Sequence, residues 1–181
     1  MNYCSNCGEK VVLVIPDGDN IPRFVCESCG TIHYKNPRMI VGCIPVLDDQ
    51  IMLCKRSIEP CMGLWTIPAG FMENDETVEE GAIRETIEET NSQIEIERLH
   101  TVYSIPQIDQ VYLLFLAKIT NFIRKPGLEC SDVRLFRAAE IPWDHIAFSA
   151  VKYALEKYIE DTDPNSNTNG NLMVHLGTHT D

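Results

Sequence analysis

Two Cys-x-x-Cys-Gly sequences near the N-terminus constrain this chain more than any other feature. Cys4 and Cys7 form the first pair, and Cys26 and Cys29 form the second. Their separation fits the roughly 15–20-residue gap between the two pairs of a structural zinc site. Glycine follows each pair and permits the tight turn that aims both sulfurs at one metal ion. Residues 1–36 are therefore predicted to form a small β unit, a zinc ribbon.

The same cysteines would also suit two redox motifs or two disulfides. A unit this short buries too little apolar surface to fold alone, so metal binding would supply its folding energy. Four thiolates complete the tetrahedral set that Zn²⁺ prefers, and zinc is the favoured interpretation. Cys43 and Cys54 lie inside apolar runs and are predicted to be small buried side chains.

Length and composition indicate one ordinary domain with a small appendage. The chain has 181 residues, of which 44% are hydrophobic, so it can bury a core. No stretch approaches the roughly 18 apolar residues of a membrane span. The first residues lack the basic segment and apolar run of a signal peptide. We therefore expect a cytoplasmic protein that has no membrane partner.

The chain carries a net charge of -12. General nucleic-acid binders usually present a basic stripe, so a long nucleic acid is not the expected partner. A small anionic substrate that arrives with a divalent cation remains compatible with this charge.

Hydrophobic patterns from residue 37 onward predict strands, a helix, more strands and a closing helix. This order favours an α+β fold with a mixed sheet over residues 37–161. Residues 162–181 are polar and rich in Asn and Thr, and they are predicted to be a disordered tail. His175 and His179 are four residues apart in this tail, where disorder would make a metal site unfavourable.

The first helix carries a crowded set of acidic residues. Thr77 and Glu80 have the spacing of a capping box, which starts the helix. Glu85, Glu88 and Glu89 then fall on one face near its C-terminal end, where their mutual repulsion and the helix dipole both oppose them.

Glycine at position 81, on that acidic face, costs about 1 kcal/mol relative to alanine. A close approach of backbone or ligand would explain it. Ile83 and Ile87 lie on the opposite face and are expected to pack on the sheet.

A hard divalent cation would explain the clustered acids, because carboxylate oxygens suit Mg²⁺ or Mn²⁺. A solvated acidic face held by Arg84 is the alternative. The wider spacing favours the cation. Gly70, Glu76, the pair Arg84-Glu85 and the pair Glu88-Glu89 reproduce the order G-x5-E-x7-R-E-x-x-E-E.

This spacing resembles the Nudix box, and the preceding GLWTIPAGFME is similar to the usual lead-in of that family. The resemblance implies an α/β/α sandwich with a mixed sheet, preceded here by the zinc ribbon. Three positions depart from the family pattern. Thr86 and Ser92 replace aliphatic residues, and Asn91 replaces the closing glycine but tolerates the left-handed conformation of a helix C-cap.

The resemblance also implies metal-dependent hydrolysis of a nucleoside diphosphate linked to another group, X. By matched position, the expected ligands of Mg²⁺ or Mn²⁺ are Glu85, Glu89, Glu88 and, directly or through water, Glu76. Arg84 would orient these carboxylates, and Gly70 would let the loop backbone run close to the metal site. The residues expected to serve catalysis are Glu88, Glu129 and Arg84.

Two further charged residues are candidates outside the box. Glu129, with Asp132 behind it, would be the additional acid that family members often take from a later loop. Arg56 would bind a phosphate group, because a guanidinium matches phosphate oxygens. Each could instead be a surface charge. The aromatic residues Trp65, Phe71, Tyr103 and Tyr112 are expected to serve packing more than base stacking.

The substrate is narrowed by resemblance alone. A zinc ribbon before a Nudix domain is similar to NADH pyrophosphatases, but their downstream S-Q-P-W-P-F-P-x-S marker is absent. The corresponding YSIPQIDQVYLLFLAKI is more similar to a group that hydrolyses FAD and ADP-ribose. We expect an ADP-X substrate and a homodimer. The alternatives are an NADH or NAD-capped RNA pyrophosphatase and a nucleotide-sensing regulatory protein.

Overall fold

The N-terminal unit, Met1–Pro37, is a three-stranded antiparallel sheet in the computed structural model, which describes residues 1–163 and 173–180. Its strands are β1 (Val12–Val14), β2 (Arg23–Val25) and β3 (Ile32–His33). Gly8 and Gly30 have φ values of 80° and 72° and close the two predicted cysteine turns. Their amides donate to the carbonyls of Cys4 and Cys26 over 3.0 and 2.8 Å.

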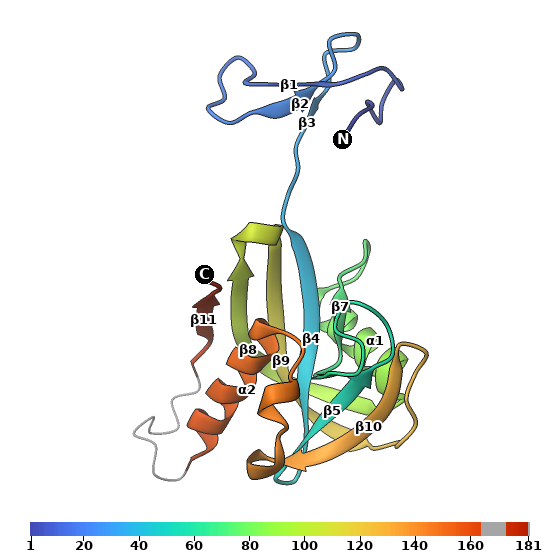
Figure 1. Cartoon of the computed structure of the whole chain (residues 1–181), viewed down its shortest axis with the longest axis vertical. Helices are drawn as coiled ribbons and strands as arrows, with labels where there is room; N and C mark the ends of the chain where they lie inside the picture. The colour runs from blue at the N-terminus through green and yellow to red at the C-terminus, as the bar shows by residue number, and fades with distance from the viewer. Residues whose placement is uncertain (164–172, 181) are drawn as a thin grey trace. The chain divides into compact units, whose positions relative to one another are not determined.

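The second unit, Arg38–Asp181, is built on an eight-stranded mixed sheet with the order β10-β5-β4-β9-β8-β11. Figure 1 shows helices α1 and α2 and the labelled strands of this unit. Strand β4 runs parallel to β9, and β11 runs parallel to β8, whereas the other pairs are antiparallel. The strands are β4 (Arg38–Leu47), β5 (Gln50–Arg56), β6 (Trp65–Thr66), β7 (Ala69–Phe71), β8 (Gln93–Ile105), β9 (Gln110–Asn121), β10 (Cys130–Arg137) and β11 (His175–Thr178).

Helices cover both faces of this sheet because its central strands are apolar on both faces. Along β4, Ile40 and Ile44 face the core that includes α2, whereas Val41 and Cys43 face the core that includes α1. The helices are α1 (Val78–Thr90), α2 (Ser149–Thr162) and the short 3-10 turns η1 (Pro106–Ile108), η2 (Ala138–Glu140) and η3 (Trp143–His145). The predicted α/β/α sandwich with a mixed sheet is confirmed.

Helix α1 begins and ends as its sequence predicts. Thr77 is the N-cap, and the capping box with Glu80 is complete, with hydrogen bonds of 3.2 and 2.8 Å. Asn91 caps the other end with a left-handed φ of 55°, and its amide donates to the Ile87 carbonyl.

The face of α1 that packs on the sheet differs from the expected one. Ile87 is 45% exposed, so the prediction that it packs on the sheet is wrong. Gly81, Ala82 and Thr86 are buried instead. The Thr86 hydroxyl donates to the Ala82 carbonyl over 2.9 Å, which satisfies it inside the core. Small residues on this face let the helix lie close to β4.

The prediction of a disordered tail is wrong for residues 175–178, which form β11. This strand pairs in parallel with β8, so that His175 lies opposite Thr101. The Tyr153 hydroxyl on α2 also donates to the Leu176 carbonyl over 2.9 Å. Polar composition hid this strand because backbone pairing to a sheet edge needs few apolar side chains. The remaining tail positions, 164–172 and 181, lie outside the described residues.

Among residues 1–163 and 173–180, no helix has both the length and the apolar character that a bilayer crossing requires.

The two units should lose structure separately. Cys26 is fully buried in the four-cysteine cluster, so Cys26→Ser should abolish hydrogen-exchange protection across residues 2–35 and leave that of 38–162 unchanged. Cys61→Ser, at a half-buried thiol of the second unit, is the matched control and should alter neither. Loss of protection in both units of Cys26→Ser would contradict separate folding.

Candidate active site

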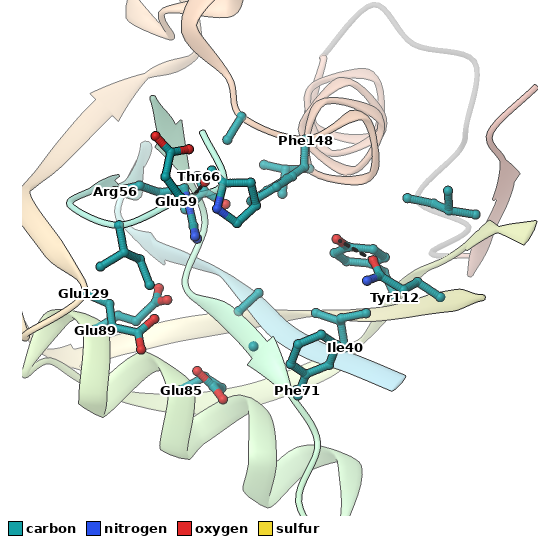
Figure 2. A pocket seen from close by; sticks show the side chains of 18 of the residues that line it. Ile40, Arg56, Glu59, Thr66, Phe71, Glu85, Glu89, Tyr112, Glu129 and Phe148 are labelled. Atoms are coloured by element: carbon teal, nitrogen blue, oxygen red, sulfur yellow. Dashed lines mark hydrogen bonds between the residues drawn. The ribbon is translucent and has the colours of Figure 1, made fainter. Parts of the chain in front are cut away.

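A cleft of about 1190 Å³ lies in the second unit between an acidic side and an apolar side. Helix α1 supplies Glu85, Glu88 and Glu89. The remaining wall includes residues of β7 and β9 and the segments 58–60 and 147–149. Figure 2 shows Glu85, Glu89 and Glu129 on one side of this cleft, with Tyr112 and Phe148 away from them. The volume is ample for a dinucleotide-sized ligand.

Four of the predicted acids meet at the cleft. Glu85, Glu88 and Glu89 come from the exposed edge and buried face of α1, and Glu129 comes from the turn just before β10. The negative charges of Glu88 and Glu129 help to raise the pKa of Glu85, after its burial. The fold thus concentrates negative charge that one helix alone would not gather.

Glu89 is the most buried of these carboxylates, with 4% of its surface exposed. Burial, with the nearby charge of Glu85, raises its pKa to about 7. The Cys54 thiol donates to Glu89 Oε2 over 3.3 Å, which is a weak hydrogen bond for a buried charge. A carboxylate in this setting fits a bound cation, which would offset both its desolvation and its repulsion from Glu85.

Arg84 pairs with three of the glutamates. Its Nε and Nη2 donate to the two Glu76 oxygens over 2.9 and 2.8 Å, and its Nη1 donates to Glu85 Oε1 over 2.7 Å. Nη1 also lies 3.3 Å from Glu88 Oε2, and Nη2 donates to the Phe71 carbonyl over 3.1 Å. These are the contacts that a residue orienting the carboxylates requires.

Glu76 is placed differently from the expectation. Both its oxygens are used by Arg84, and Oε1 also accepts from the Glu73 amide over 2.7 Å. These bonds lower its pKa to about 2. It is absent from the cleft lining within the described part of the chain. The structure therefore favours Glu76 as the anchor of Arg84 over the predicted role of metal ligand.

Other atoms approach the backbone closely at both Gly70 and Gly81, where a side chain would clash with them. A Cβ on Gly70 would overlap the Glu85 carboxylate, as expected for a loop that runs against the acidic group. A Cβ on Gly81 would lie 2.6 Å from Glu76 Oε1 and 2.8 Å from Val41 on β4. The glycine in the helix is therefore explained by packing, without a ligand beside it.

Arg56 lies at the cleft and is not a surface charge. It is 9% exposed, and its Nε donates to the Pro60 carbonyl over 2.7 Å. Its guanidinium lies 5.2 Å from the Phe148 ring centroid. Glu129 also lines the cleft, whereas Asp132 is bound by Arg134 Nε over 2.6 Å and is absent from that lining.

Of the four aromatic residues expected to serve packing, three are buried and one is exposed. Trp65, Tyr103 and Tyr112 are buried in the core, as expected, and Tyr112 also reaches the cleft wall. Phe71 is 50% exposed and lines the cleft, so it is not a core residue. The expectation that it serves packing more than base stacking stays a prediction. The Arg38 guanidinium lies 5.0 Å from its ring centroid.

Several cleft residues carried no recognisable signal in the sequence. Phe148, Pro60 and His179 line the cleft from segments far from the acidic helix. Cys54 was expected only as a buried apolar residue, and its bond to Glu89 joins β5 to α1. Only the tertiary fold brings these segments together.

The four N-terminal cysteines converge, with their sulfurs all within 4.8 Å of one another. Cys4 and Cys29 sulfurs lie 3.7 Å apart, and those of Cys7 and Cys26 lie 3.4 Å apart. Sulfurs about 2.3 Å from a tetrahedral zinc ion would be roughly 3.8 Å apart. All eight cysteines are free thiols, so the disulfide alternative is not what the structure forms.

Comparison with known families decides the assignment. A family model described as the NUDIX domain matches residues 36–155, and one described as Nudix N-terminal, a zinc ribbon, matches residues 2–35. The chain belongs to the Nudix family. The predictions of this family, of its ribbon and of a pyrophosphate-hydrolysing enzyme class are confirmed at this level.

Individual relatives of this Nudix chain differ in their named substrates. It is similar to the crystal structure of a NUDIX hydrolase from Nitrosomonas europaea, with 49% identity, a TM-score of 0.93 and full coverage of both chains. It is 32% identical to an ADP-ribose pyrophosphatase from Methanocaldococcus jannaschii, over 62% of this chain and 70% of that protein. It is also 32% identical to an NAD-capped RNA hydrolase NudC from Photobacterium profundum, over 78% of this chain. The match spans about half, 52%, of that NudC protein.

The buried carboxyl of this Nudix site should govern the pH dependence of stability when divalent cations are absent. The folded protein binds the Glu89 proton more tightly than the unfolded chain, so the free energy of unfolding should fall as pH rises from about 4.5 to about 7. Glu89→Gln removes this titration. Above pH 7 it should be more stable than the wild type, by up to about 3 kcal/mol.

Urea unfolding followed by tryptophan fluorescence measures this directly, because both tryptophans, Trp65 and Trp143, lie in the second unit. The matched control is Glu88→Gln on the exposed side of α1, which should retain the wild-type pH dependence. Added Mg²⁺ should stabilise the wild type more than Glu89→Gln. Equal pH dependence in wild type and Glu89→Gln would show that burial does not hold a proton at this site.

Proposed function

We propose that this protein is a divalent-metal-dependent hydrolase that cleaves the pyrophosphate bond of an ADP-X compound, with FAD or ADP-ribose favoured as substrate. The products would be AMP and X-phosphate. The observation that carries the proposal is the two-sided cleft, with Glu85, Glu89 and Glu129 on one side and Tyr112 and Phe148 away from them. Glu88 lines the cleft from the same helix as Glu85 and Glu89. A pyrophosphate with its cations fits the first side, and a base or flavin ring fits the second.

The acidic side fits Mg²⁺ or Mn²⁺. Glu85 and Glu89 would be the main ligands, with Glu88 beside them, because their oxygens suit a hard cation and Glu89 is buried without a full partner. A bound cation would neutralise the pyrophosphate and activate water for attack. Arg84 would hold Glu85 and Glu88 in place through the contacts described above.

The protein's own groups would complete the reaction. Arg56 would bind a phosphate oxygen, since its fork is held by Pro60 and Phe148 at the cleft wall. Glu129 would accept a proton from the attacking water, because it lines the cleft on the same side as Glu85 and Glu89. Gly70 would allow the loop backbone to lie against Glu85.

Apolar groups support a substrate with a planar ring. Phe71 and Ile108 are about half exposed at the cleft wall, at 50% and 49%, and Leu128 is 99% exposed. Exposed apolar side chains around a cleft are typical of a ligand site. ADP-ribose offers one such ring and FAD offers two, so both can cover this surface.

A second candidate is hydrolysis of NADH or of NAD-capped RNA. The match to NudC from Photobacterium profundum, over 78% of this chain, supports it. The net charge of -12 opposes binding of the RNA body, although a cap alone could enter the cleft. A nucleotide sensor with little turnover would not need to keep the buried Glu89 next to Glu85.

For the N-terminal unit we propose Zn²⁺ as the ion held by Cys4, Cys7, Cys26 and Cys29, in a structural role. The four converging sulfurs support that choice. We further propose that the protein works as a homodimer, on the resemblance to ribbon-bearing relatives.

A hydrolysis panel tests the substrate. FAD, ADP-ribose, NADH, NAD and NAD-capped RNA would each be incubated with wild type and Glu89→Gln, in Mg²⁺ and in Mn²⁺, and the nucleotide products separated by chromatography. FAD or ADP-ribose should be turned over fastest. Glu89→Gln should lose at least about a hundredfold in kcat. Fastest turnover of NADH or NAD-capped RNA would favour the second candidate, and no turnover by folded protein would favour the sensor.

Variants of Glu129 and Asp132 test whether Glu129 takes part in catalysis or is only a surface charge. Glu129→Gln should lower kcat by about 10²–10⁴-fold with a smaller change in KM, if Glu129 accepts the proton. Asp132→Asn is its matched control, because Asp132 is three residues away but paired with Arg134, and it should stay within a few-fold of wild type. Equal activity of the two variants would remove Glu129 from the proposed mechanism.

A further inference from the structure

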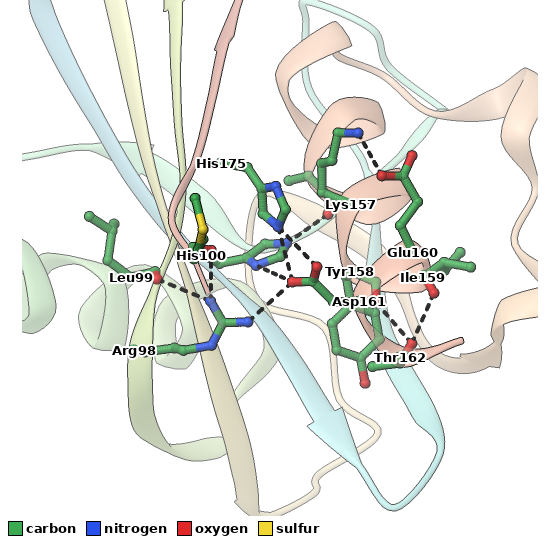
Figure 3. A network of polar contacts seen from close by, with 12 residues as sticks. Arg98, Leu99, His100, Lys157, Tyr158, Ile159, Glu160, Asp161, Thr162 and His175 are labelled. Carbon is green, nitrogen blue, oxygen red and sulfur yellow. Dashed lines mark hydrogen bonds and ion pairs between the residues drawn. The ribbon is translucent and has the colours of Figure 1, made fainter. Parts of the chain in front are cut away.

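Three potential metal ligands from three separate elements meet on the side of the sheet that α2 covers. His100 comes from β8, Asp161 from the last turn of α2 and His175 from β11. One ligand atom of each lies within 4.8 Å of the other two. Figure 3 shows the two imidazoles and the carboxylate pointing toward one another. None of these residues lines the substrate cleft among the described residues.

The Nδ1 atom of His100 faces this cluster without a hydrogen-bond partner among the described residues. The side chain is completely buried, and its Nε2 lies 3.1 Å from the Ala154 carbonyl oxygen. A carbonyl only accepts hydrogen bonds, so Nε2 carries the hydrogen and Nδ1 carries a lone pair. Nδ1 has no hydrogen-bond partner within the described residues, and the Asp161 carboxylate lies 3.9 Å away. Two acceptors therefore face each other in a buried place, which is unfavourable without a positive group between them.

The rest of the cluster fits a metal ion of the zinc class. His175 Nε2 lies 3.0 and 3.2 Å from the two Asp161 oxygens, and the Asp161 side chain is 7% exposed. Ligands about 2.0–2.1 Å from a tetrahedral zinc ion are roughly 3.3 Å apart, which lies between the 3.0 and 3.9 Å separations seen here. Imidazole nitrogen favours Zn²⁺ over Mg²⁺. The Ala154 carbonyl would act as the outer partner that orients a ligating histidine.

We propose that His100 Nδ1, Asp161 and His175 Nε2 form a second transition-metal site, of the zinc class, that fastens β11 to the body of the domain. The metal takes the place of the hydrogen between His175 Nε2 and Asp161, and that hydrogen moves to Nδ1 of the same neutral ring. Water or the second Asp161 oxygen completes the coordination. The site is independent of the proposed hydrolysis.

Arg98 is the competing cation. Its Nη2 lies 3.4 Å from Asp161 Oδ2, and its Nη1 lies 3.4 and 3.5 Å from the carbonyls of Leu99 and Met173. A simple ion pair between Arg98 and Asp161 is therefore the plain alternative. The ion pair neutralises the Asp161 carboxylate but leaves His100 Nδ1 without a hydrogen-bond partner among the described residues. A metal ion would bind His100 Nδ1, Asp161 and His175 Nε2 together.

The site has a consequence for the cleft. His179 directly follows the strand that His175 begins. Its amide donates to the Ser104 carbonyl over 2.9 Å, and its carbonyl accepts from Gln107 Nε2 over 3.3 Å. His179 and Gln107 both line the cleft. A metal ion at His175 would thus hold one wall of the cleft in place from outside it.

Metal content of the full chain tests the proposal. Wild type, His175→Ala, Asp161→Asn and His179→Ala would be equilibrated with excess Zn²⁺ and millimolar Mg²⁺, freed of unbound metal by gel filtration and analysed by mass spectrometry. The ribbon cysteines and the cleft carboxylates are the same in every variant. His175→Ala and Asp161→Asn should each hold one zinc ion per chain fewer than wild type. His179→Ala, on the same strand segment, should hold as many as wild type.

Hydrogen exchange supplies a second readout. Zn²⁺ should slow exchange of the amides of 176–178 in wild type at least about tenfold, once free zinc exceeds the dissociation constant by that factor. In His175→Ala it should leave them unchanged. His175→Ala could release β11 by itself, without any effect of metal. Asp161→Asn preserves the size of its side chain and leaves β11 unaltered in sequence, so it controls for that effect. Equal zinc content in wild type and both ligand variants would overturn the proposal and leave the Arg98–Asp161 ion pair as the explanation.

Discussion

The acidic site depends on the five hydrogen bonds that the Arg84 guanidinium donates. A single guanidinium binds both oxygens of Glu76, reaches Glu85 and Glu88, and holds the Phe71 carbonyl. The loop before α1 is thereby tied to the helix, and two of the clustered acids are neutralised in part. Glu89 is buried and receives none of these hydrogen bonds from Arg84. The site therefore holds two kinds of acid. The charges of Glu76, Glu85 and Glu88 are partly neutralised by Arg84, whereas the buried charge of Glu89 would be neutralised by a cation.

The buried position of Glu89 follows from how α1 packs. Small side chains at Gly81, Ala82 and Thr86 form the face against β4, so the helix lies close to the sheet and carries Glu89 beneath the cleft surface. Thr86 stands where the family pattern has an aliphatic residue, and its hydroxyl is satisfied within its own helix. The departure from the pattern therefore preserves the packing that the chemistry needs.

Local rules predicted much of this protein, and long-range contacts account for most of what they missed. The capping box at Thr77, the turn at Asn91 and the cysteine knuckles depend on neighbours in the sequence, and each formed as predicted. The buried face of α1 was missed because Ile83 and Ile87 were weighed by apolarity, whereas close approach selected small residues. β11 was missed because its stability comes from pairing with β8, for which the tail's composition gives no signal. Glu76 matches the motif position, but spacing alone does not show that both its oxygens bond to Arg84. A metal contact of Glu76 through water stays a prediction.

The two ends of the cleft impose different demands on the fold, and different elements meet them. The acidic end needs fixed distances between like charges. One helix with a bound arginine supplies three of the acids, and the turn before β10 adds Glu129. The apolar end needs a surface that accepts a ring, and it is assembled from β7, β9, the η1 turn and the segment around Phe148. Only the helical acids and Arg84 are contiguous in sequence, which explains why a pattern identifies the pyrophosphate chemistry but not the group X. Substrate choice within this family would accordingly reside in segments that can vary without disturbing the helix.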